Sequence, residues 1–84
     1  MRAALQRSAP RTDLAAAQAV WPEVVGAAIA AAAEPISERD GVLTVRCASA
    51  TWAQELSLME AELLERLRER LGEAAPSSLK VSAG

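Results

Sequence analysis

Apolar residues recur every three or four positions between residues 51 and 71, and this spacing predicts an amphipathic helix. Its other face carries glutamate and arginine side chains. Thr51 and Gln54 match the capping box that begins many helices, and Gly72 is suited to end this one. The apolar stripe, which we expect to pack in the core, consists of Trp52, Leu56, Met59, Leu63, Leu64, Leu67 and Leu71.

A different pattern, in which apolar and polar residues alternate, predicts strands around a tight turn. Residues 42–47 are rich in β-branched side chains, and a short strand near Pro35 and Ile36 precedes them. Asp40-Gly41 lies between the two and supplies the positive φ angles that a tight hairpin needs. One face of the second strand carries Leu43, Val45 and Cys47, and we interpret Cys47 as a small buried apolar residue.

The segment from residue 13 to residue 33 is dominated by alanine and predicts a first helical region. Thr12 or Asp13 is a suitable N-cap. Proline fits the first turn of a helix better than its middle, so we expect either two helices that divide at Pro22 or one kinked helix. Gly26 is costly inside a helix, and we expect another backbone to approach it closely.

The order of these elements predicts an α+β fold. A last short strand follows Pro76, where Leu79 and Val81 alternate with polar residues. The chain then reads helix or helices, β-hairpin, helix and strand, which is typical of a two-layer sandwich with a three-stranded sheet and helices on one face. We expect a single domain over residues 13–84, preceded by a flexible basic arm over residues 1–12.

Composition excludes most catalytic chemistry. The chain has 84 residues, no His and one Cys, so the usual histidine-based nucleophile systems and His or Cys metal sites are ruled out. No nucleotide-binding glycine motif is present. We therefore expect a protein that is not an enzyme, with no catalytic, cofactor or metal site and no small-molecule substrate.

The same composition bears on location. A lone thiol fits the reducing cytosol, and no apolar segment approaches the ~20 residues that a membrane span requires. We therefore expect a cytoplasmic protein that does not bind membranes.

Charge argues against a surface that is basic as a whole. Nine Lys and Arg residues are set against eleven Asp and Glu, a formal net charge of −2. The acid-free segment at the start of the chain is the exception, and its Arg2, Arg7 and Arg11 are candidates for contacts to phosphates. Both Trp residues are most simply core residues, although exposed Trp can stack on bases or anchor a protein interface.

The chain also resembles a known family. The residues that carry the resemblance are Trp21-Pro22-Glu23-Val24-Val25-Gly26, Pro35, Gly41-Val42-Leu43-Thr44-Val45, Ala50-Thr51-Trp52-Ala53-Gln54-Glu55-Leu56, and the leucines before Gly72. In order and spacing they are similar to the DciA family over about residues 15–82. The resemblance implies a KH-like domain and a role in bacterial DNA replication, where members bind the replicative helicase and aid its loading or operation on DNA.

Two function classes stay open on this basis. The first is a replication accessory protein whose main activity is helicase contact, for which Trp52, Gln54, Arg66 and Arg70 are the candidate contact residues. Single-stranded DNA would then be bound only weakly and in a salt-sensitive manner. The alternative is a stand-alone KH-like module for single-stranded DNA or RNA, although the Gly-x-x-Gly loop by which KH domains clamp nucleic acid is absent.

Overall fold

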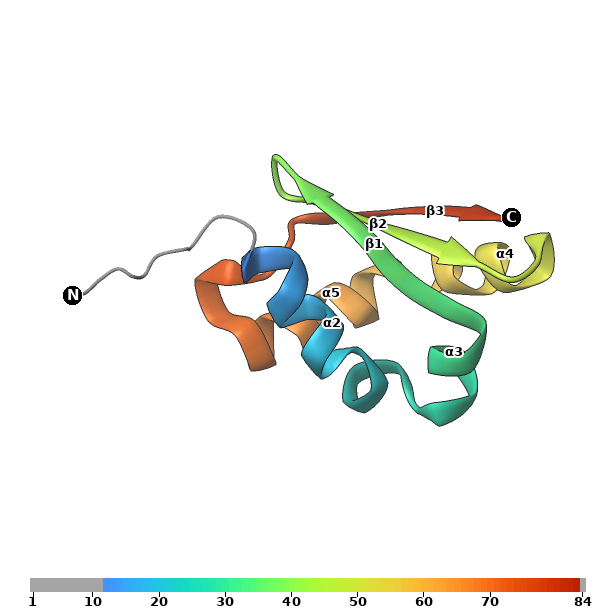
Figure 1. Cartoon of the computed structure of the whole chain (residues 1–84), viewed down its shortest axis with the longest axis horizontal. Coiled ribbons are helices and arrows are strands. Elements are labelled where there is room, and N and C mark those ends of the chain that lie inside the picture. The colour runs from blue at the N-terminus through green and yellow to red at the C-terminus, as the bar shows by residue number, and fades with distance from the viewer. Residues whose placement is uncertain (1–11, 84) are drawn as a thin grey trace.

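The computed structural model describes residues 12–83 and confirms the helix, hairpin, helix, strand order (Figure 1). The basic arm, with Arg2, Arg7 and Arg11, lies outside the described residues. The helices and strands, in chain order, are α2 (Thr12–Val25), α3 (Ala27–Ala32), β1 (Ala33–Arg39), β2 (Val42–Cys47), α4 (Ala50–Leu58), α5 (Glu60–Leu71), the short 3-10 helix η1 (Gly72–Ala74) and β3 (Ser78–Ala83).

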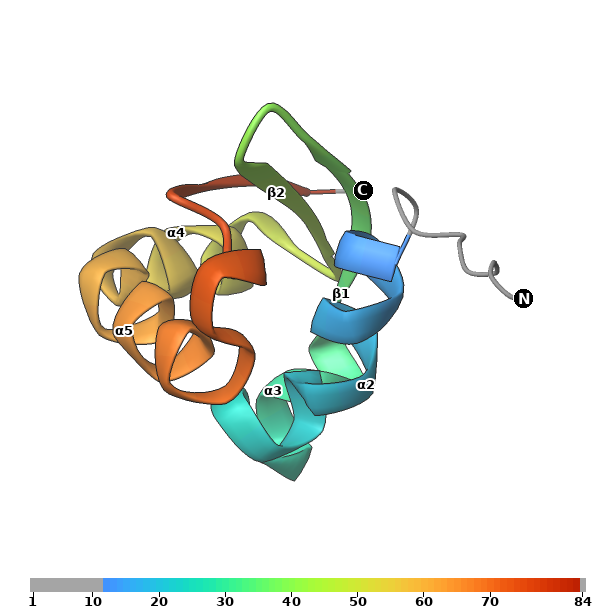
Figure 2. The ribbon, with the colours of Figure 1, turned by 90° about the vertical axis from the view of Figure 1, so that its left-hand side faces the viewer.

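The three strands form one mixed sheet in the order β1-β2-β3. β1 and β2 are antiparallel, and β3 runs parallel to β2 because the two helices α4 and α5 carry the chain back between them. All of the helices lie on one side of this sheet, and its other side is open (Figures 1 and 2). The α+β fold with helices on one face is therefore confirmed.

The β-hairpin forms as the Asp-Gly pair predicts. Asp40 and Gly41 have φ angles of +55° and +81°, the two consecutive positive values of the tight turns that best match the twist of paired strands. On β2, Leu43, Val45 and Cys47 are at most 1% exposed and face the helices. Cys47 is therefore the buried residue that the alternation predicts.

The core lies between the sheet and the helices. The leucines of the C-terminal helical region, Leu56, Leu63 and Leu67, are fully buried, as the apolar stripe predicts. Trp21 is 3% exposed, which confirms that it belongs to the core, whereas Trp52 is only half-buried and packs against the core from its edge.

The first helical region divides at Gly26, so the first of the two expected alternatives, a division at Pro22, is wrong. Pro22 lies inside α2, which continues until the Gly26 N–H donates to the Pro22 carbonyl at 2.8 Å. Gly26 then has φ +92° and ψ +161°, a conformation almost restricted to glycine. A Cβ built there would meet nothing within 4 Å, so the expected close approach of another backbone is also wrong.

The C-terminal helical region is two helices where one was expected. α4 begins at Ala50, and its N-cap is Ser49, whose hydroxyl accepts the Trp52 backbone N–H at 3.2 Å; Thr51 does not fill this role. The chain turns at Met59 because α4 packs mainly on β3, whereas α5 packs on α2. Gly72 ends α5 with φ +61°, as predicted.

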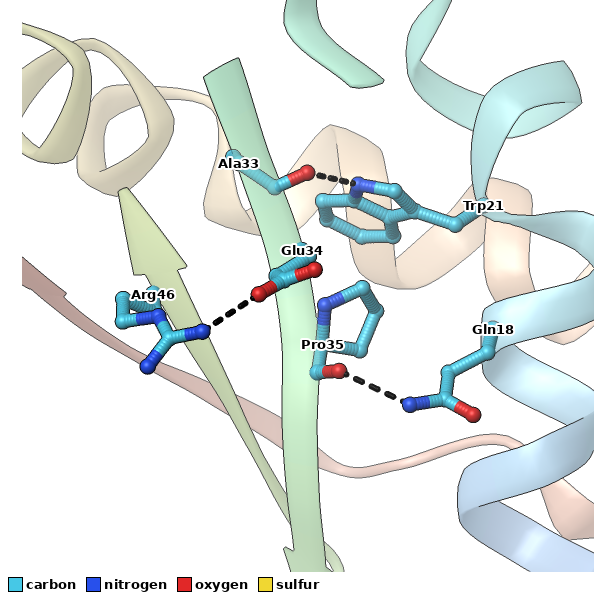
Figure 3. Close-up of polar contacts among 6 residues, drawn as sticks. All are labelled: Gln18, Trp21, Ala33, Glu34, Pro35 and Arg46. Atoms are coloured by element: carbon cyan, nitrogen blue, oxygen red, sulfur yellow. Dashed lines mark hydrogen bonds and ion pairs between the residues drawn. The ribbon is translucent and has the colours of Figure 1, made fainter. Parts of the chain in front are cut away.

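Side chains of α2 cover the outer edge of β1 (Figure 3). Trp21 Nε1–H donates to the Ala33 carbonyl at 2.9 Å, and Gln18 Nε2–H donates to the Pro35 carbonyl at 3.0 Å. Pro35 has no backbone N–H to offer, so it suits an edge strand. This half of the β1 edge therefore has few free groups for pairing with another strand.

Replacement of Gly41 by alanine is expected to lower the free energy of unfolding by about 1–3 kcal/mol. The φ of +81° is strained for any residue with a Cβ, and that Cβ would lie 2.8 Å from Ser77 Oγ. Chemical denaturation of Gly41→Ala measures the total cost. The Gly41→Ala/Ser77→Ala double variant should recover only the steric part, and an unchanged midpoint for Gly41→Ala would contradict the strain.

Candidate partner-binding site

A hollow of about 260 Å³ lies on the seam between α2 and α5 and gathers charged side chains from both helices. Two of the four candidate contact residues, Arg66 and Arg70, line it together on α5. The residues that line the hollow are Glu23, Val24, Arg66, Glu69 and Arg70. The structure thus brings the two arginines together and places acidic residues beside them.

Arg66 connects the two helices through the backbone. Its Nη1–H donates to the Val24 carbonyl at 2.9 Å, in the last turn of α2, where carbonyls have no partner within the helix. Its Nη2 forms an ion pair with Glu62, one turn earlier on α5. Because the guanidinium carries five N–H donors, these contacts leave donors for a partner.

Arg70 reaches across the same seam to Glu23, with which it forms an ion pair. Both side chains of this pair are about half exposed, and pairs of this kind contribute about 0–1 kcal/mol to stability. A partner carboxylate could therefore replace Glu23 at small cost to the fold.

Trp52 and Gln54 lie away from this seam. Both are on α4, none of whose residues lines the hollow, and Figure 1 shows α4 near the C-terminal end of β3. Gln54 is exposed, and Trp52 is half-buried. The four candidate residues therefore do not form one continuous cluster.

Sequence reasoning missed three features of the helical layer. Glu23 and Val24 contact residues more than forty positions away in the chain, and no local pattern marks such pairs. Leu58 is 77% exposed at the end of α4. Its position off the apolar stripe was a signal that could have identified it as a surface residue.

Neither a metal site nor a reactive thiol is found in the part of the chain that the structure describes. Residues 12–83 contain no group of three or more Cys, Asp or Glu side chains placed to hold an ion. Burial removes Cys47 from water and raises the pKa of its thiol, which disfavours the nucleophilic thiolate. In the same range, every helix is too short or too polar to cross a membrane.

By its structure the protein is a small α+β domain with exposed ion pairs on its helices. Comparison with known proteins then gives its family. The family model described as "Dna[CI] antecedent, DciA" matches residues 1–81, and the chain belongs to the DciA family. The resemblance noted from the sequence is thereby confirmed.

Related bacterial proteins agree with this assignment. The chain is 39% identical to a UPF0232 protein of Rhodococcus jostii, over 62 residues that cover 74% of this chain and 33% of the relative. It is 42% identical to a UPF0232 protein of Mycolicibacterium paratuberculosis, with 74% and 34% covered. A Mycobacterium tuberculosis UPF0232 protein is 40% identical over 74% and 33%. The matched residues cover only about a third of each relative, so this chain is less than two thirds as long as the relatives it matches.

Proposed function

We propose that the protein is a non-enzymatic accessory of bacterial DNA replication that binds the replicative helicase and assists its loading or operation on DNA. The observation that carries the proposal is the family match over residues 1–81, to a family described as an antecedent of DnaC and DnaI. The missing His residues and the buried, protonated Cys47 support a role in binding over one in catalysis.

The helicase contact is proposed to centre on the seam between α2 and α5. Arg66 and Arg70 are exposed there, and their intramolecular partners Glu62 and Glu23 hold them in place. Preordered arginines lose less side-chain entropy on binding and are frequent anchors of protein interfaces. We propose Gln54 and Trp52 on α4 as a second, peripheral contact.

Co-purification with the replicative helicase of the host tests the function directly. Full-length tagged protein is mixed with the helicase, with and without single-stranded DNA, and the complex is resolved by size-exclusion chromatography. We expect a complex in both cases. If folded protein elutes apart from the helicase in both, the proposal is wrong.

The double variant Arg66→Glu/Arg70→Glu is expected to bind the helicase about tenfold more weakly or worse, because reversed charges at an interface are repelled by the partner groups that matched them. Affinity is measured by surface plasmon resonance, after circular dichroism has shown that the variant is folded. Arg68→Glu is the control, since Arg68 is exposed on the same helix but does not line the hollow. Equal affinities of the double variant and the wild type would exclude the seam as the contact.

A further inference from the structure

The side of the sheet that faces away from the helices, here called the open face, is rich in basic and hydroxyl side chains. Alternate residues of each strand point away from the helices, and most of them are basic or carry hydroxyl groups. The basic residues and hydroxyls of this open face are Arg39, Arg46, Lys80, Ser37, Thr44, Ser78 and Ser82.

Charge is divided between the two layers of the molecule. Six of the nine basic residues lie within residues 12–83, together with all eleven acidic residues. Three of those six bases are on the open face, whereas eight of the eleven acids lie on helical segments. The strand register gives the open face a single acid, Glu34, with Asp40 in the turn at its rim. A chain that is acidic as a whole therefore has one basic face.

The bases of this face are largely available to a ligand. No ion pair within residues 12–83 involves Arg39 or Lys80. Arg46 pairs with Glu34 at 2.6 Å across the two strands, with both side chains at least half exposed (Figure 3). An exposed pair of this kind is weak, and a second anion can share the guanidinium.

The register also places the three bases in three different rows of the sheet. Arg39 lies opposite Val42, Lys80 opposite Thr44, and Arg46 opposite Ser82. These pairs belong to three successive rows across the sheet, about 6.6 Å apart, because side chains on one face recur every second residue. One cation lies in each row, on β1, β3 and β2 in turn, and this staggered ladder suits a flexible ligand with repeated negative charges.

We propose that this open face binds the phosphodiester backbone of single-stranded DNA. The choice of DNA among polyanions rests on the proposed function, and the ladder of bases and hydroxyls supports backbone contact. A flexible single strand can lay successive phosphates on a twisted sheet, whereas a rigid duplex touches it along a line. The only aromatic residues, Trp21 and Trp52, are on the helices below, so binding is electrostatic and tolerant of sequence.

The test compares two variants of the full chain that lose the same charge from opposite layers. Arg39→Gln/Lys80→Gln removes two bases from the open face, and Arg68→Gln/Arg70→Gln removes two from α5. Binding of a fluorescent oligo-dT is measured by anisotropy at several salt concentrations. Each phosphate contact to a single strand contributes about 0.7 to the log–log salt slope. The log–log salt slope of the open-face variant should therefore be smaller than that of wild type by about 1.4. When salt is raised from 50 to 200 mM, the affinity of this variant for the oligonucleotide should fall about sevenfold less than the affinity of wild type.

The α5 variant should keep the wild-type slope. If both variants lost the same amount of salt slope, the net charge of the protein and not the position of the bases would determine binding. If the open-face variant kept the wild-type slope, other residues, such as the basic arm, would hold the DNA. Either result overturns the proposal. Tighter binding of a duplex or of an RNA strand of equal length would overturn the choice of single-stranded DNA.

Helicase co-purification separates this proposal from the proposed function. Arg39→Gln/Lys80→Gln should bind the helicase as wild type does, because these residues lie on the layer opposite α5. Failure of the wild type to bind helicase would contradict the proposed function, while the salt slopes would still report on the open face.

Discussion

Trp21→Ala is expected to lower the melting temperature by roughly 15–35 °C, or to leave the domain unfolded at room temperature. Trp21 is 3% exposed, and such truncations cost about 3–5 kcal/mol. An 84-residue chain has a free energy of unfolding of only about 4–12 kcal/mol. The Trp21 indole N–H also donates to the Ala33 carbonyl at 2.9 Å, so the substitution removes a buried hydrogen bond to β1.

Two further variants divide this effect into its parts. Trp21→Phe keeps most of the ring volume but leaves the Ala33 carbonyl without its donor, and should cost about 1–3 kcal/mol. Trp52→Ala should cost less than Trp21→Ala, because Trp52 is half-buried. Thermal unfolding followed by circular dichroism measures all three. A Trp21→Ala protein that melts close to wild type would show that α2 is not held to β1 through this ring.

Local patterns were enough to predict the hairpin and the core face of the sheet. Asp40 and Gly41 adopt positive φ because of their own chemistry, and the alternation through β2 requires only that one face be buried. The same is true of the leucine stripe, whose spacing places Leu56, Leu63 and Leu67 in the core. In these elements local and tertiary preferences agree.

The misplaced helix boundaries have tertiary causes. Pro22 disfavours the helix locally, but burial of Trp21 and Val24 on the same helix carries α2 past it to Gly26. The break at Met59 follows from α4 and α5 packing on different neighbours. Neither the burial of Trp21 and Val24 nor the different neighbours of α4 and α5 can be predicted from local helix propensity or from the spacing of apolar residues.

The candidate site was predictable only in part, for the same reason. Arg66 and Arg70 are one turn apart, so the sequence alone places them on one side of a helix. Their partners Val24 and Glu23 come from α2, and only the folded chain shows them. The open face depends on the parallel register of β3, which sets Lys80 beside Thr44. No local pattern predicts that register.

The free energy of unfolding is expected to fall by up to about 2 kcal/mol between pH 8 and pH 10 because of Cys47. Burial raises the pKa of this thiol in the folded protein. In the unfolded chain a thiol ionises near pH 8.5, so above that pH the unfolded state has lost a proton that the native state retains. Stability then decreases with rising pH, by at most about 1.4 kcal/mol per unit.

Cys47→Ala provides the control that isolates this contribution. The chain contains no Tyr or His, so few other groups titrate in this range, and the variant retains all of them. Urea unfolding at a series of pH values should give a steeper alkaline decline for wild type than for Cys47→Ala, and the two curves should converge as pH rises. Parallel curves would mean that the folded thiol ionises as readily as the unfolded one, which would contradict its burial between β2 and the helices.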